Sequence, residues 1–142
     1  MPAFIYNSCP RDSAIGNIDF DTDAFKIMLL GAAYTPNTDT HTKRSDLTSE
    51  AAGTGYTAGG LAVTCTVSAV NAGTDNFTLT FAATSWPAST ITARYAAVYK
   101  SRGGASTADE LVCLQDHGSA ISSTNGTFTV PSFAITVQNN NP

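Results

Sequence analysis

Three alternating carboxylates, Asp19, Asp21 and Asp23, form the first pattern in the sequence that suggests chemistry. Carboxylates at this spacing open the calcium loop of an EF-hand, which also needs a Gly at its sixth position and a Glu at its twelfth. Here those positions hold Ala24 and Leu30, so the EF-hand pattern fails. We interpret the triplet as a solvated turn before a strand, with an adventitious cation as the alternative.

Two histidines, His41 and His117, are the only imidazoles available for acid–base chemistry. Each lies in a polar stretch beside an aspartate, Asp39 or Asp116. A Ser–His–Asp site of the α/β-hydrolase type would show a Gly-x-Ser-x-Gly elbow, and the sequence contains none. The sequence therefore predicts no catalytic residue, with a small hydrolase that uses His41 or His117 as the alternative.

The three cysteines, Cys9, Cys65 and Cys113, are odd in number and form no Cys-x-x-Cys pair. Neither a zinc site nor a disulfide framework is indicated by that spacing. No basic residue pattern marks Cys9 or Cys113 as an activated thiol, and Cys65 alternates in phase with apolar residues, which predicts a buried thiol. We predict a protein that is not an enzyme and has no cofactor and no metal.

A glycine-rich run at 53–60 surrounds Tyr56 and leads into a strand pattern. It lacks the Lys-Ser/Thr of a phosphate-binding loop, so its glycines are expected to serve tight turns or the close approach of another backbone. Trp86 beside Pro87 fits two roles, an anchor for a partner or a cap on the core.

The charged fraction of the chain is only 13%, where ~25% is typical of globular domains. The net charge of −4 argues against nucleic acid, which is bound through clustered Lys and Arg. No apolar run approaches the ~20 residues of a membrane span, and no signal-peptide pattern is visible. We expect no nucleic acid and no membrane as partners, and a neutral surface that suits contact with other proteins.

The run 25–30 is apolar at both alternating sets of positions, which predicts a strand that is covered on both faces. It is followed by a long polar loop at 36–50, of a length that is typical of functional or interface-forming loops. Alternating segments predict further strands, listed by residue number as 61–67, 77–81, 91–100, 110–114, 126–130 and 132–137. In the segment 91–100, every second residue from Ile91 to Tyr99 is expected to share one face, and 85–89 is expected to be a loop.

Together these segments predict an all-β fold, an antiparallel β-sandwich that is jelly-roll-like and has six to eight strands. We expect an irregular N-terminal arm over 1–17, one β-sandwich domain over 18–137, and a loose C-terminal tail over 138–142.

Three segments together resemble a family of small virion structural proteins of tailed bacteriophages: IDFDTDAFKIMLLGAAYTPNTDTH at 18–41, GTGYTAGGLAVT at 53–64, and WPASTITARYAAVYK at 86–100. The resemblance spans roughly residues 18–130. The chain departs from it at its start, MPAFIYNSCPRD, and lacks a Gly-Ile-Phe-type ending. The resemblance implies a head decoration (cement-like) protein without enzyme activity; a tail or fibre module involved in host-surface binding is the alternative.

This resemblance implies the major capsid protein as the partner, the capsid surface of the virion as the location, and synthesis in the host bacterial cytoplasm. A homo-oligomer, dimer or trimer, is expected on the shell. We expect the contacts on the loop 36–50, the glycine-rich loop and the N-terminal arm. The candidate interface residues are Tyr34, Pro36, Asp39, His41, Lys43, Arg44, Tyr56 and Trp86.

Overall fold

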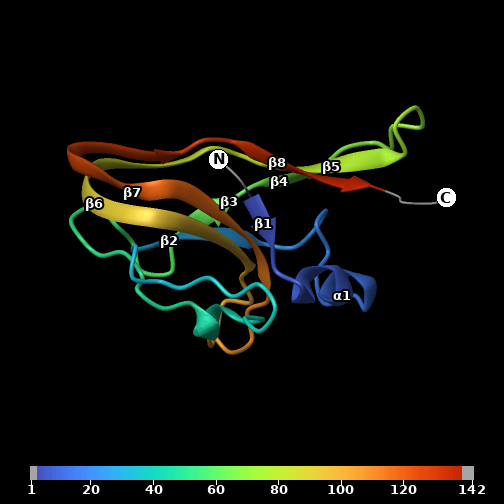
Figure 1. Cartoon of the computed structure of the whole chain (residues 1–142), viewed down its shortest axis with the longest axis horizontal. Coiled ribbons are helices and arrows are strands. Elements are labelled where there is room, and N and C mark those ends of the chain that lie inside the picture. Colours follow the sequence, from blue (N-terminus) through green and yellow to red (C-terminus); the bar gives the residue numbers. More distant parts are fainter. Residues whose placement is uncertain (1–2, 139–142) are drawn as a thin grey trace.

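The computed structural model describes residues 3–138, about half of which lie in two antiparallel β-sheets packed face to face (Figure 1). The larger sheet has the order β1 (Ala3–Ile5), β7 (Leu111–Val130), β6 (Thr84–Lys100), β2 (Phe25–Leu30) and β3 (Leu61–Val63). The smaller sheet has the order β4 (Cys65–Val67), β5 (Asn76–Phe81) and β8 (Phe133–Gln138). The predicted all-β antiparallel sandwich is confirmed, and its jelly-roll-like character stays a prediction.

One long two-stranded ribbon connects the two sheets. The pairing of β5 with β8 ends at Phe81↔Phe133, and the pairing of β6 with β7 resumes in the same register at Thr84↔Val130. The ribbon then folds over, so that one end lies in the smaller sheet and the other in the larger sheet (Figure 1). The predicted separate strands 110–114 and 126–130 are therefore wrong, because both belong to the single strand β7.

The prediction of a loop at 85–89 is also wrong, because these residues lie inside β6. The register shifts between Trp86 and Ser89, where Ala88 has a φ of 48°. A bulge of this kind accommodates Pro87, which has no N–H to donate to a ladder, and bends the strand at the fold of the ribbon.

A further register shift, between Ala93 and Tyr95, reverses the faces of β6. Ala93 packs in the cluster between the two sheets, whereas Tyr95 and Tyr99 pack in a second cluster on the opposite face of the larger sheet. The prediction that alternate residues of 91–100 share one face is wrong, because the bulge changes the alternation in mid-strand.

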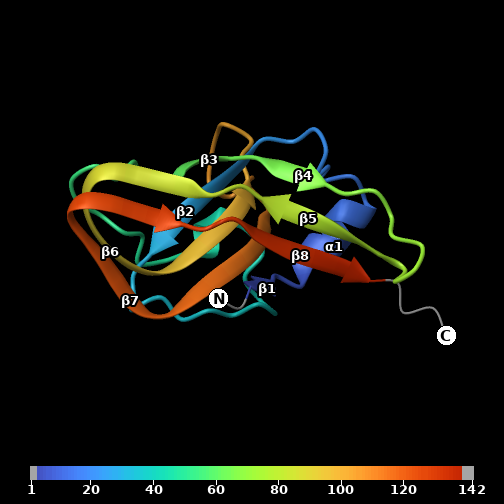
Figure 2. The same ribbon diagram turned by 90° about the horizontal axis from the view of Figure 1, so that it is seen from above.

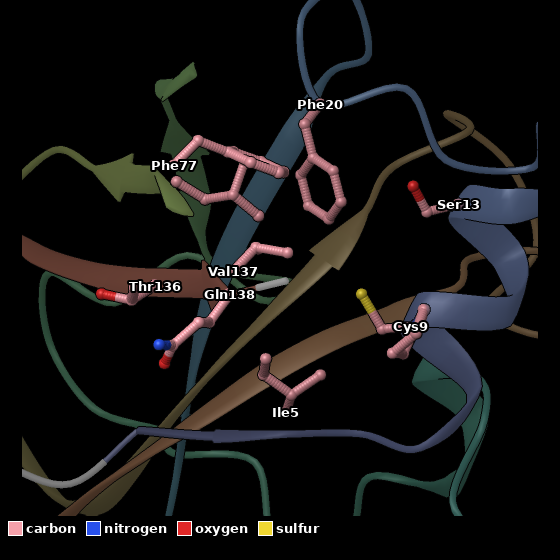
Figure 3. A pocket seen from close by; sticks show the side chains of 10 residues that line it. Ile5, Cys9, Ser13, Phe20, Phe77, Thr136, Val137 and Gln138 are labelled. Atoms are coloured by element: carbon pink, nitrogen blue, oxygen red, sulfur yellow. The ribbon is translucent and has the colours of Figure 1, made fainter. Parts of the chain in front are cut away.

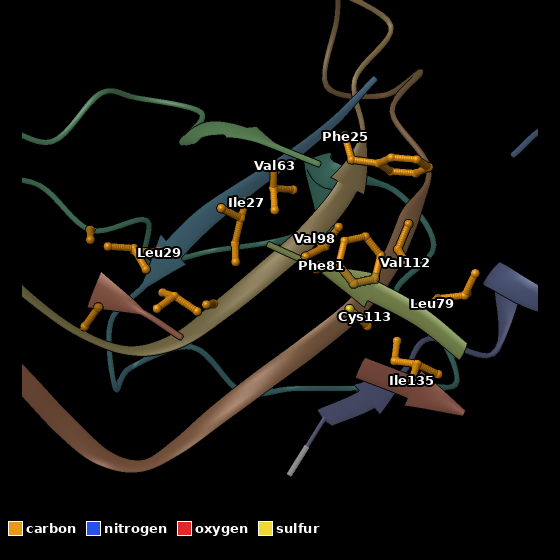
Figure 4. Packing of buried hydrophobic residues seen from close by; sticks show 14 of the residues in the cluster. Phe25, Ile27, Leu29, Val63, Leu79, Phe81, Val98, Val112, Cys113 and Ile135 are labelled. Carbon is orange, nitrogen blue, oxygen red and sulfur yellow. The ribbon is translucent and has the colours of Figure 1, made fainter. Parts of the chain in front are cut away.

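The strand β2 is covered on both faces, as the sequence predicted. Phe25, Ile27 and Leu29 pack between the sheets (Figure 4). Met28 and Leu30 point to the second cluster, which also includes Tyr6, Tyr34, Leu47, Tyr95, Ala97, Tyr99, Leu111 and Leu114.

The segment 61–67 forms two strands in place of the single one that was predicted. β3 pairs with β2 in the larger sheet, and β4 pairs with β5 in the smaller sheet. The chain therefore changes sheets at Thr64, which is exposed. Only the second half of this segment, β4, pairs with the predicted strand 77–81, which is part of β5.

The N-terminal segment is not an irregular arm over its described part. After β1, the helix α1 (Ser8–Ala14) tolerates Pro10 in its first turn and ends before Gly16, which has a φ of 82°. Cys9 on this helix is buried against the core cluster. At the other end, Gln138 belongs to β8, and the rest of the predicted tail lies outside the described residues.

Replacing Leu29 by Ala is expected to lower the free energy of unfolding by about 2–5 kcal/mol, because a fully buried side chain is removed from the core. Urea unfolding followed by the fluorescence of the single Trp, Trp86, measures this loss. The matched control Ile15→Ala alters a side chain that is 55% exposed and should change stability by less than about 0.5 kcal/mol. Equal effects of the two variants would contradict the packing of β2.

Candidate interaction surface

Residues 31–60, which we call the cover segment, first cross the outer face of the larger sheet, where Tyr34 and Leu47 join the second cluster, and then run beside β2, where Ala51 and Tyr56 pack on the cluster between the sheets. It is attached to β2 by a backbone hydrogen bond from Ala51 N to Leu29 O (2.8 Å) and by a β-bridge between Glu50 and Leu30, and it is closed on itself by a bond from Gly31 N to Ser49 O (2.7 Å). The expected long loop 36–50 is part of this layer and contains one short 3₁₀ turn, Arg44–Asp46. Most of the predicted interface residues therefore lie on one layer of the molecule.

A chain of three side chains ties the cover segment to the N-terminal segment. The hydroxyls of Tyr6 and Tyr34 lie 3.1 Å apart, and the Tyr34 hydroxyl lies 2.8 Å from Nδ1 of His41. Burial raises the pKa of both tyrosines, so both remain neutral hydrogen-bonding groups. Tyr34 is 2% exposed, so its place in the predicted interface is corrected: it fixes the cover segment from inside.

Two cations of the cover segment, Lys43 and Arg44, are paired within the chain. Arg44 Nε lies 2.7 Å from an oxygen of Asp109, and Lys43 Nζ lies 3.3 Å from Glu110. Arg102 also binds Glu110, at 2.7 Å. Burial raises the pKa of Glu110, but the hydrogen bonds from Arg102 and Lys43 outweigh it and hold the pKa below its usual value. Lys43 and Arg44, which were predicted to be interface residues, thus neutralise buried carboxylates.

The glycine-rich part of the cover segment lies directly on backbone, as the sequence predicted. A Cβ on Gly53 would collide with the carbonyl of Thr90, and a Cβ on Gly60 would collide with that of Ile27. Tyr56, half-buried in the same loop, accepts a hydrogen bond from the Leu29 N–H (3.2 Å) and donates one to a carboxylate oxygen of Glu50 (2.9 Å). These contacts hold residues 53–60 against β2 and β6.

Of the exposed stretches of the cover segment, residues 35–42, which we call its tip, hold the predicted interface residues that stay accessible. Pro36 and Asp39 are exposed there, and His41 is half-buried. Asn7 Nδ2 donates a hydrogen bond to Asp39 at 2.5 Å, which anchors this tip to the start of α1. Trp86 is only 1% exposed and packs in the core, so its inclusion in the interface is corrected.

Sequence reasoning missed the residues that bind the cations of the cover segment. Asp109 and Glu110 are 1% and 2% exposed, and they follow Arg102 on the connection between β6 and β7. The sequence did contain a signal for these residues, because three charged residues lie within nine positions of a chain that has few charged residues. Charges grouped in this way in a charge-poor sequence indicate mutual pairing.

The acidic triplet uses its carboxylates within its own turn. Asp23 accepts a hydrogen bond from the Asp19 N–H (2.7 Å), Asp19 accepts one from the Asp21 N–H (2.9 Å), and Asp23 pairs with Lys100 at 2.7 Å. Hydrogen bonds from Thr22 and Asp21 lower the pKa of Asp19. Within residues 3–138, no group of three or more His, Cys, Asp or Glu side chains is placed to hold a metal ion.

The remaining candidates for chemistry lie apart from one another. His41 is bonded to Tyr34, whereas His117 packs against the ring of Phe128, where burial lowers its pKa. Burial raises the pKa of Cys9 to about 12 and that of Cys65 to about 11, which disfavours a thiolate nucleophile. Cys65 is half-buried and packs against the core cluster, a more exposed position than the buried one that was predicted.

Comparisons with protein-family models, with curated proteins and with solved structures return no match for this chain. Among residues 3–138, no helix is long and apolar enough to cross a membrane.

Gly60→Ala is expected to destabilise the fold more than Gly103→Ala, although the two glycines have nearly equal φ values of 79° and 78°. Both variants place an alanine in a left-handed backbone conformation, which costs about 1–2 kcal/mol. Only at Gly60 would the new Cβ also collide with the backbone of another segment. Thermal unfolding of the two variants measures the difference, which we expect to exceed about 1 kcal/mol. Equal melting temperatures would contradict the close packing of the cover segment on the backbone of β2.

Glu110→Gln is expected to reduce the pH dependence of stability in acid. Because the folded pKa of Glu110 lies below its usual value of 4.5, the carboxylate stabilises the fold above that pH, and this contribution is lost as the pH falls through the folded pKa. The wild type and the variant should therefore differ most near neutral pH and converge in acid. Urea unfolding across this range measures the gap, and parallel curves would contradict the role of Glu110.

Proposed function

We propose that the chain is a capsid decoration (cement) protein of a tailed bacteriophage, which binds the outside of the assembled head shell. The observation that carries this proposal is the tip of the cover segment. It is exposed, it is held in place by Asn7, Tyr34 and the sheet beneath, and the cations that follow it are already paired within the chain. The sequence resemblance to small phage virion proteins points in the same direction.

An ordered and nearly neutral surface suits repeated contact with a shell of major capsid protein. A segment that is already fixed loses little conformational freedom on binding. Its paired cations need no partner from the shell, so their burial at an interface would leave no unpaired charge. The proposed contact is therefore one of shape and polar groups, with Pro36 and His41 at its centre beside the carboxylate of Asp39, which accepts a hydrogen bond from Asn7.

The proposed mechanism of stabilisation is mass action. A protein that binds the assembled shell, but not its separated subunits, stabilises the shell by RT ln(1 + [L]/Kd) at each site. Repetition over many equivalent sites multiplies this gain. A weak contact at each site is sufficient, which agrees with the small open tip of the cover segment.

Pro36→Glu is expected to abolish binding to shells that lack the protein, because it replaces an apolar contact by a second carboxylate beside Asp39 in the centre of the proposed contact. The matched control is Thr66→Glu, which adds the same charge to an exposed residue of β4 on the other layer and should leave binding unchanged. Co-sedimentation with shells and the melting temperature of the shells are the two readouts. If both variants bind like the wild type, the proposed contact surface is wrong.

The number of copies per virion separates the cement role from a tail or fibre module. A cement protein is present in hundreds of copies, and its removal lowers the stability of the shell. A host-binding module is present in a few copies, and its deletion abolishes adsorption. Quantitative mass spectrometry of purified particles gives this number, and a few copies would overturn the proposal.

A further inference from the structure

The strand β8 forms an edge of the smaller sheet that is unusually open. Within residues 3–138, the other edge strands β1, β3 and β4 have three residues each, whereas β8 has six. Its sequence, FAITVQ, contains no charged residue and no proline. Folded proteins normally protect edge strands by shortness, charge or proline, and β8 has none of these protections.

The backbone groups on this edge are directed away from the rest of the chain. Thr78 of β5 accepts a hydrogen bond from the Ser68 N–H (2.9 Å), and its own N–H donates to Ser68 Oγ (2.9 Å), so Thr78 faces the β4 side. Thr136 lies opposite Thr78 in the register of β5 with β8. Because the two members of such a pair in an antiparallel ladder point in opposite directions, the N–H and C=O of Thr136 point to the open edge. The same alternation directs those of Ala134 to this edge.

The strand is also complementary to itself. Its inward side chains are Phe133, Ile135 and Val137, which pack on or against the core cluster, while Ala134 and Thr136 face solvent. An antiparallel pair of two β8 strands, centred on Ile135, places Ala134 opposite Thr136 of the second copy and inward apolar side chains opposite one another. The net charge of −4 opposes self-association elsewhere, but no charge lies on β8 itself.

We propose that β8 is the contact surface of a two-fold homodimer, in which the β8 strands of two copies pair antiparallel and join the two three-stranded sheets into one of six strands. In Figure 2, β8 runs along one margin of the upper layer. The expected dimer or trimer is thereby narrowed to a two-fold dimer that is formed through the β8 edge. It does not depend on the capsid.

A groove beside this edge also favours a second copy of the chain as the partner. A cavity of about 390 Å³ lies between α1 and the inner side of β5 and β8, and its apolar lining includes Ile5, Phe20, Phe77 and Val137 (Figure 3). Thr136 also lines this cavity, so the open edge of β8 borders it. A second β8 strand would add its own inward apolar side chains beside the groove and remove more of this lining from water.

Thr136→Pro tests the proposal, because proline removes the N–H that points to the open edge and leaves the ladder with β5 in place. We expect sedimentation equilibrium to give the wild type twice the chain mass of 14.7 kDa, and to give Thr136→Pro the mass of one chain. The matched control is Val67→Pro, on the opposite edge of the same sheet, which should remain a dimer. Circular dichroism and thermal unfolding verify that both variants are folded.

Three outcomes would overturn the proposal: a monomeric wild type over the whole concentration range, a folded Thr136→Pro that remains dimeric, or a trimer. If Thr136→Pro does not fold, Thr136→Lys replaces it, since a lysine on the exposed face of the edge repels its counterpart across the two-fold axis. The assay contains no shells, so its result is separate from that of the capsid-binding experiment.

Discussion

The register kept between the β5–β8 pair and the start of the β6–β7 pair is the constraint on which the rest of the structure depends. Because the ribbon resumes in the same register after the short gap at the change of sheet, the two sheets face each other as a consequence of one bend. The bulge between Trp86 and Ser89 allows this bend, and Ser89 Oγ is held there by the Trp86 carbonyl at 2.8 Å and by Ser123 at 2.8 Å. Trp86, beside this bulge, packs against the rings of Tyr56 and Phe128 in the core cluster.

The bulge between Ala93 and Tyr95 explains why the chain needs a cover segment. It turns Tyr95 and Tyr99 to the outer face of the larger sheet, where β2 adds Met28 and Leu30. An aromatic surface of this kind must be removed from water, and residues 31–60 do so without regular strands of their own. Glycines at the backbone contacts and paired ions at the rim allow this irregular layer to lie close to the sheet.

The sequence was most informative where local alternation decides the structure. Both faces of β2 and the pairing of β4 with β5 follow from residues that are neighbours in the chain. The two bulges were not predictable in this way, because they depend on the register with β7, far along the sequence. The helix α1 has only seven residues and contains Pro10, so it shows no clear helical period. In the candidate interface, Tyr34 and Trp86 were wrongly predicted to lie at the surface. An aromatic residue in a polar stretch of sequence does not reveal whether its side chain faces solvent or the core.

The two surfaces proposed for binding lie on different layers, and this separation matters for how they would work together. The cover segment lies on the outer face of the larger sheet, whereas β8 is an edge of the smaller sheet. Pairing through β8 therefore leaves the tip of the cover segment free on both copies. A two-fold dimer would present two tips at a fixed spacing, so that binding of the first raises the effective concentration of the second. A contact that is weak for a single chain would become strong for the pair wherever the spacing of sites on the shell matches that of the tips.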